Sequence, residues 1–172
     1  LKDYQESLAE LVANHRDQIA TLKKDIASEQ KTYNKSYQER TQAYQDELNK
    51  LNGADDDRKK DVETQIAEEL AKGRYADLTK LASLRARLVY EDAAHKESVA
   101  TADKAYRDDL TNLQTSHSER LAALQTSLDT EMAIQKQYQE DFNTYRDYQI
   151  ADDITKLKAS YVEKQAEDLR AH

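Results

Sequence analysis

Apolar and ring-bearing side chains recur at intervals of eleven residues through much of this chain. In the first part, one row consists of Tyr4, His15, Ile26, Tyr37 and Leu48, and a second of Leu11, Leu22, Tyr33 and Tyr44. Eleven residues make three turns at about 3.67 residues per turn, so such a stripe runs almost straight along one helix face. The spacing predicts long α-helices with an eleven-residue (hendecad) coiled-coil period.

The same period returns in the second part of the chain. One row there is formed by Leu88, Val99, Leu110, Leu121 and Met132, and a second by His95, Tyr106, His117 and Leu128. We expect the residues that hold the coiled-coil seam together to be Leu11, Leu22, Ile26, Leu88, Val99, Tyr106, Leu110, Leu121 and Leu128. Most of the chain therefore fits a single elongated helical region over residues 1–172.

Turn-forming residues are almost absent, which restricts the fold class further. The chain has no Pro, 2 Gly and no Cys among its 172 residues. Sandwiches, barrels and doubly wound sheets use Gly and Pro at their many turns, and Ala, Glu, Lys, Leu and Arg make up just under half of this sequence. The composition favours an all-α protein without β-structure, either an extended rod or a helical hairpin or bundle.

One segment resembles a turn, and two outcomes stay open there. Residues 52–57 read Asn-Gly-Ala-Asp-Asp-Asp, a pattern that can turn the chain and cap a following helix. The seam nevertheless passes through in step, with Asp55 and Lys59 at its positions. A turn at 52–57 and another near 115 would give a three-helix bundle, whereas continuous helix would give a rod. The second glycine, Gly73, is expected to be only a weak spot within a helix.

The apolar stripe is too narrow for one helix to be stable alone. Helices in water gain most of their stability by packing an apolar face, and here several seam positions hold Tyr, His or Ala. Tyr hydroxyls and His nitrogens need partners or water, so they suit a partly hydrated seam. We therefore expect a homo-oligomer or a helical partner protein.

Aromatic residues cluster near the C-terminal part of the chain. Tyr138, Phe142, Tyr145 and Tyr148 follow one another at spacings of four, three and three residues, which places them on one helical face. Such a face is either an aromatic anchor for a binding partner or the best-packed layer of a bundle.

No residue pattern predicts catalysis, a cofactor or a metal. The sequence has no Glu-x-x-His pair for a carboxylate metal centre and no Gly-rich phosphate loop. The acidic run Asp55-Asp56-Asp57 lacks the alternating ligands of a calcium loop, and the side chains of the acidic doublets diverge on a helix. The net charge of −8 argues against nucleic acid as a partner, and no apolar run is long enough for membrane insertion. We expect a protein that is not an enzyme.

A short motif repeats within the helical pattern. Residues 44–51, Tyr-Gln-Asp-Glu-Leu-Asn-Lys-Leu, are echoed at 106–113. They are loosely similar to segments of phage tail tape-measure coiled coils, stator or motor stalks, and Tyr-rich stalks of bacterial adhesins, with no motif that transfers a residue role. The predicted function is a structural rod, stalk, spacer or tape-measure-like element. The alternative is a compact antiparallel three-helix bundle that binds a receptor or partner, of the bacteriocin, toxin or surface-protein type.

Overall fold

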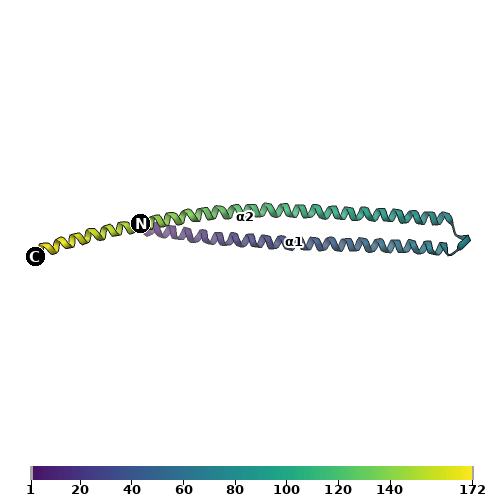
Figure 1. The fold of residues 1–172 in the computed structure, drawn as a ribbon, viewed down its shortest axis with the longest axis horizontal. Helices are drawn as coiled ribbons and strands as arrows, with labels where there is room; N and C mark the ends of the chain where they lie inside the picture. The colour runs from purple at the N-terminus through teal and green to yellow at the C-terminus, as the bar shows by residue number, and fades with distance from the viewer. Residues whose placement is uncertain (1, 172) are drawn as a thin grey trace. The chain divides into compact units, whose positions relative to one another are not determined.

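The computed structural model describes residues 2–171 as two long α-helices joined by a short turn (Figure 1). Helix α1 spans Lys2–Leu70, the 3-10 helix η1 spans Gly73–Tyr75, and helix α2 spans Leu78–Ala171. No strand occurs among the described residues. The all-α fold class expected from the lack of turn-forming residues is confirmed.

The chain turns at residues 71–77 and nowhere else between 2 and 171. Helix α1 continues through residues 52–57, and α2 continues through residue 115, so neither the three-helix bundle nor one unbroken helix over the whole chain is formed. The Asn-Gly-Ala-Asp-Asp-Asp segment stays helical because its Asp55 side chain lies against α2, with only 4% of the residue exposed. A polar side chain therefore occupies the seam where apolar residues are missing.

Gly73, expected to be only a weak spot, lies at the centre of the turn. Its φ of +58° is in the left-handed region, which favours glycine because other residues bring Cβ close to the following carbonyl. Asp77 then begins α2, since its Oδ1 accepts a hydrogen bond of 3.1 Å from the Lys80 amide. Gly73 thus allows the chain to reverse its direction, and Asp77 caps the start of α2.

The helices contribute to two compact units, which we describe separately. The hairpin unit comprises residues 30–119, where the second half of α1 and the first part of α2 lie side by side in opposite directions around the turn (Figure 1). Its most buried apolar residues are Val62, Leu81, Leu84 and Leu113. These side chains lie where the two helix faces meet, as expected for amphipathic helices.

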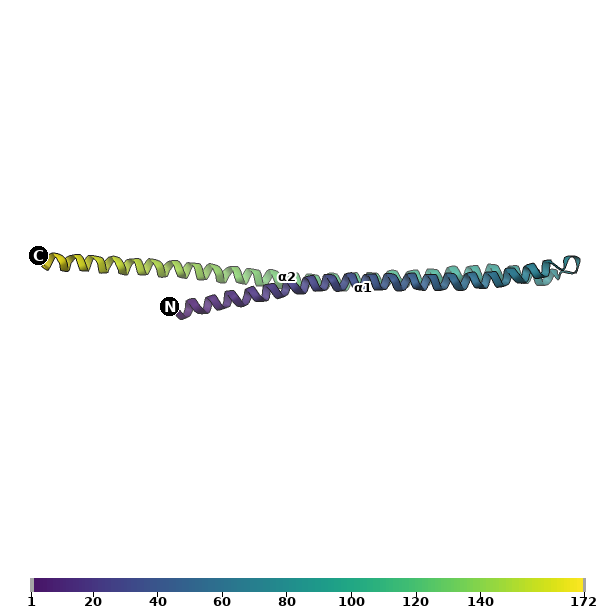
Figure 2. The ribbon, with the colours of Figure 1, turned by 90° about the horizontal axis from the view of Figure 1, so that it is seen from below.

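The terminal unit comprises the described residues 2–29 and 120–171. Its buried apolar residues are Leu8, Val12, Ile19 and Leu128. Helix α2 continues past the beginning of α1 in this unit (Figure 2), and residues 153–171 are all exposed. We call residues 150–171 the tail.

Candidate functional site

The contact surface between α1 and α2 is the candidate site, because the aromatic, histidine and buried acidic side chains of both units gather there. In the hairpin unit, the rings of Tyr44 and Tyr106 stack with centroids 4.2 Å apart and planes inclined by 2°. The Tyr44 hydroxyl donates a hydrogen bond of 2.9 Å to Asp103, and the Tyr106 hydroxyl lies 2.8 Å from Thr41 Oγ1. Each hydroxyl therefore has a partner across the seam, as half-buried tyrosines require.

This arrangement also changes the acidity of Tyr44. Ionisation of its phenol would break the hydrogen bond to Asp103 and place two negative charges together, so the pKa of Tyr44 is raised above its usual value. Asp103 is itself paired with Arg107 one turn along α2. The Tyr44 hydroxyl therefore keeps its proton, and with it the hydrogen bond to Asp103, to a higher pH than an ordinary tyrosine.

A second aromatic layer combines a tyrosine with a histidine. The rings of Tyr33 and His117 stack at 4.0 Å with an angle of 12°, and His117 Nε2 lies 3.3 Å from Gln30 Oε1. His117 is 7% exposed. Rings stacked across the seam fill the space between two helices without branched aliphatic side chains.

A polar layer occupies the segment that resembles a turn in the sequence. Lys59 Nζ lies 3.1 Å from Asp55 Oδ2 and 3.2 Å from Asp92 Oδ1, so it bridges the two helices. The hydrogen bonds from Lys59 to these two carboxylates raise its pKa, and Asp55 has the larger effect. His95 Nε2 is 3.9 Å from Asp55 Oδ2, while Asp55 Oδ1 has no hydrogen-bond partner among the described residues. A partly buried polar layer of this kind favours one register over others, because a shift would separate Asp55 and Lys59 from their partners on α2.

Glu69 forms a further buried acidic site beside the turn. It is 2% exposed and accepts hydrogen bonds of 2.8 Å from Lys72 Nζ and from the Asp77 backbone amide. The Lys72 ammonium, followed by the Asp77 amide, lowers the pKa of Glu69 to about 2. Lys80 Nζ lies 3.6 Å away, so one carboxylate ties the end of α1 to the start of α2.

The terminal unit has its own ring contacts across the seam. His15 Nδ1 lies 2.5 Å from Glu131 Oε2, and the His15 ring lies 5.3 Å from that of Tyr138. Tyr4 and Tyr145 meet edge to face at 4.9 Å. Aromatic contacts are thus common to both units.

The predicted seam residues differ in how far they are buried. Leu128 is buried, and the half-buried members of the set are Leu22, Ile26, Leu88, Val99, Tyr106, Leu110 and Leu121. Leu11 instead is 37% exposed, and its neighbour Val12, at 7%, takes the inward position. Adjacent apolar residues point about 100° apart on a helix, and the repeat alone does not choose between them.

The predicted aromatic face divides into two parts. Tyr138, Phe142 and Tyr145 are half-buried, while Tyr148 is 67% exposed. Burial raises the pKa of the Tyr145 hydroxyl, which has no hydrogen-bond partner among the described residues. Three of the four rings therefore lie at or near the α1 contact, and Tyr148 points to solvent.

The sequence analysis did not predict the role of Glu69. It placed Asp55 in step with the seam but predicted no contact for it. The positions of Asp55 and Lys59 in step with the seam were the available signal for the polar layer. No sequence pattern indicated Glu69, because its partners Lys72 and Asp77 come together only where the chain turns.

A groove also runs along one side of the helix pair in the hairpin unit. It has a volume of about 910 Å³ and small side chains along its floor, namely Ala43, Ala94, Ser98, Thr101, Ala102 and Ala105. Tyr44, Leu51 and Tyr106 add apolar surface. These short side chains leave the space open, because they do not extend far enough to fill it.

Two searches among residues 2–171 gave negative results. No group of three or more His, Asp or Glu side chains is placed to hold a metal ion, and neither helix contains a stretch apolar enough to cross a membrane. Comparison of the chain with protein-family models, curated proteins and solved structures found no match.

Proposed function

We propose that this chain is a structural protein without enzymatic activity that acts as a rod, stalk or spacer, as tape-measure-like coiled coils do. Its helices would pack through an eleven-residue period, and copies or helical partners would associate side by side or end to end. In this role the seam residues hold the helices together, and the charged outer faces keep the assembly in solution.

One observation supports the proposal: side-chain contacts between α1 and α2 recur at intervals along the helices within each unit. The terminal unit has the Tyr4–Tyr145, His15–Glu131 and Glu29–Arg120 pairs. The hairpin unit has the Tyr33–His117, Tyr44–Tyr106 and Lys59–Asp92 pairs. The Tyr, His, Glu and Lys side chains of these pairs, which are residue types that catalyse reactions in enzymes, make contacts between the two helices. This supports a function based on length and stiffness.

Small-angle scattering with absolute mass calibration tests the proposal. A helix of 94 residues such as α2 rises about 140 Å at 1.5 Å per residue. If the protein is a spacer, the maximum dimension in solution is at least about 140 Å. A dimension of about 80 Å, which is the length of a bundle with some 55 residues per helix, would contradict the spacer function.

A partner-binding module is the second candidate, and one observation favours it. Tyr148 presents a large ring to solvent, beside the half-buried Tyr145. Exposed aromatic rings are frequent anchors at interfaces. In this alternative the helix pair is a scaffold that presents residues near 148 to a receptor.

A further inference from the structure

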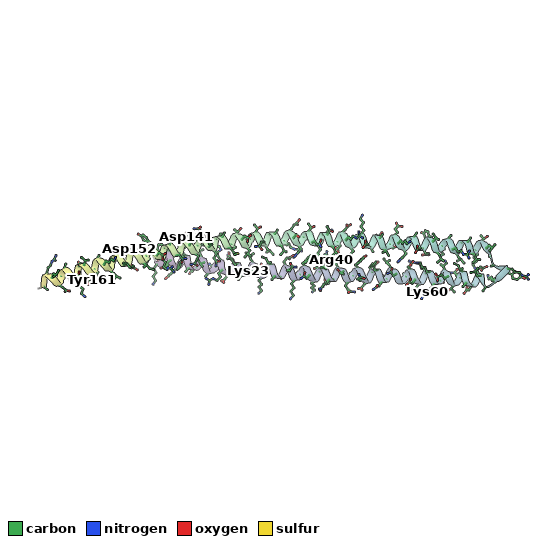
Figure 3. The ribbon with its side chains drawn as sticks, viewed as in Figure 1. Lys23, Arg40, Lys60, Asp141, Asp152 and Tyr161 are labelled. Atoms are coloured by element: carbon green, nitrogen blue, oxygen red, sulfur yellow. The ribbon has the colours of Figure 1, made fainter. Side chains whose placement is uncertain are left out.

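The tail carries an apolar stripe that no other part of the terminal unit covers. Ile150, Ile154, Leu157 and Tyr161 follow one another at spacings of four, three and four residues, so they share one face. Their exposed fractions are 50%, 47%, 69% and 64%. Figure 3 labels Tyr161 on the part of α2 beyond the start of α1. Four neighbouring apolar residues in water form a surface whose burial is favourable, because it removes apolar area from water.

Ile154 of this stripe lies on the opposite side of α2 from Tyr145, whose ring contacts α1. Tyr145 packs against Tyr4 of α1, and Ile154 follows Tyr145 by nine residues, about 2.5 helical turns. Half-integral turns place two residues on opposite sides of a helix. The stripe is therefore accessible to another molecule from the side of α2 that α1 does not occupy.

The groove of the hairpin unit matches the stripe in length. Its lining on α1 extends from Arg40 to Leu51, and the stripe extends from Ile150 to Tyr161. Both spans cover eleven residue steps, about 16 Å of helix. The groove floor of small residues leaves room for the larger side chains of the stripe.

Charges at the edges of the groove and of the tail stripe are complementary when the tail runs in the same direction as α1. Arg40, which is bound to Asp109, lies at one end of the groove, and Glu47 and Glu97 line it further along, on α1 and α2 respectively. Asp153 lies near the beginning of the tail stripe. A tail aligned in the direction of α1 would bring Asp153 toward Arg40.

The basic residues of the tail fit the same direction. Lys158 and Lys164 flank the later part of the stripe on its two opposite edges, because they are six residues apart, about 1.7 turns. Glu47 and Glu97 likewise lie on the two different helices that border the groove. Each acidic residue of the groove would thus face one lysine of the tail.

We propose that the tail of one copy docks in the groove of a second copy. Within a single chain, the tail and the α2 wall of the groove belong to one uninterrupted α-helix, Leu78–Ala171, so the tail would have to break that helix to reach its own groove. The docked arrangement is a local three-helix layer made by two molecules. Because the two surfaces differ, each added copy leaves one free tail and one free groove, and association continues head to tail.

The inference rests on the proposed spacer function, since it names the partner for its oligomeric packing, but the two fail separately. Scattering at low concentration measures the length of one chain, whereas the experiment below measures association. Three helical turns make a small interface, so contacts of this size are weak and require measurement over a wide concentration range.

Sedimentation equilibrium of the full chain and two double variants tests the docking. The tail variant, Ile154→Lys with Leu157→Lys, removes the apolar stripe. The groove variant, Ala43→Lys with Ala105→Lys, fills the groove at two exposed positions. For the unchanged chain, we expect the average mass to rise with concentration beyond twice the monomer mass of 19.8 kDa. Each variant alone should remain monomeric.

An equimolar mixture of the two variants gives the decisive result. The tail variant keeps an intact groove and the groove variant keeps an intact tail, so the mixture should form a complex of two chains and nothing larger. Controls on other faces, Ala82→Lys with Ala86→Lys and Ala159→Lys with Ala166→Lys, should associate like the unchanged chain, since all four positions are exposed.

Three outcomes would overturn the inference. They are a monomer at every concentration, a groove variant that associates as well as the unchanged chain, and a mixture that forms no complex. The second of these would indicate that tails associate with tails. Circular dichroism checks that each variant remains helical.

A charge-reversal pair provides an independent test without large side chains in the groove. Glu47→Lys with Glu97→Lys, or Lys158→Glu with Lys164→Glu, should each weaken association about tenfold. Combining both reversals in one chain should restore association, because every acidic residue of the groove and every lysine of the tail then exchange their charges together. A chain with all four reversals that associates no more strongly than either double variant would contradict the proposed direction of docking.

Discussion

Tyr44 of α1 and Tyr106 of α2 stack face to face, with their centroids 4.2 Å apart and their hydroxyl groups bound by side chains of the opposite helix. Tyr44 and Tyr106 lie on opposite sides of the turn and far apart in sequence, so the stack reports directly on the register of the hairpin unit. A shift by one helical turn would separate the rings and leave both hydroxyls without these partners.

Substitutions at Tyr106 separate the contribution of the ring from that of the hydroxyl. Tyr106→Phe keeps the stack and loses the Thr41 hydrogen bond, and should lower the free energy of unfolding by about 1 kcal/mol. Tyr106→Ala also removes the stack and should cost about 2–3 kcal/mol. Urea unfolding followed by circular dichroism measures both. Equal effects of the two variants would show that the ring stack contributes little.

Glu69 should make the turn sensitive to acid. Its pKa in the folded protein, about 2, lies below the ordinary value of 4.5, so the folded state holds the carboxylate in preference to the acid. This contribution to stability is complete above pH 4.5 and is lost as the pH falls toward 2. The stability difference between the unchanged chain and Glu69→Gln should therefore shrink over this range.

Urea unfolding at pH 7, 4.5, 3 and 2 measures that difference. Glu68→Gln is the matched control, because Glu68 is the adjacent acidic residue and is exposed. The control should show no comparable dependence on pH. A Glu69→Gln variant whose deficit persists unchanged at pH 2 would contradict the assigned role of the carboxylate charge.

The two glycines should respond to alanine in opposite directions. Gly53 lies inside α1 with no atom within 4 Å of an added Cβ, so Gly53→Ala should stabilise the protein by about 1 kcal/mol. Gly73 has open space as well, but its φ of +58° penalises any other residue, so Gly73→Ala should destabilise by about 1–2 kcal/mol. Thermal unfolding of both variants compares them. A destabilised Gly53→Ala would instead favour a turn at 52–57.

Two neighbouring tyrosines should distinguish packing from partner binding. Tyr145 packs against Tyr4, so Tyr145→Ala should lower the melting temperature. Tyr148 is 67% exposed, so Tyr148→Ala should leave the melting temperature unchanged. Differential scanning calorimetry provides the measurement. A drop for Tyr148→Ala as large as that for Tyr145→Ala would place both rings in one packed layer and weaken the case for a partner-binding residue at 148.

The sequence by itself determined the all-α class, because a chain without Pro and with 2 Gly cannot form the many turns of a sheet protein. It also indicated which side chains recur on one helix face, because that recurrence is a property of the residue spacing alone. The register of Asp55 with the seam was visible in the spacing.

Only the tertiary structure decided where the chain turns and which residues meet. The chain turns at Gly73, expected to be only a weak spot, and not at 52–57 or near residue 115, where turns were predicted. At the turn with its left-handed Gly73, Glu69 accepts hydrogen bonds from Lys72 and from the Asp77 amide. At residues 52–57, which stay helical, Asp55 is paired with Lys59, and Lys59 reaches Asp92 of the other helix. The choice depends on contacts between residues distant in sequence, which a periodic pattern along one helix does not contain.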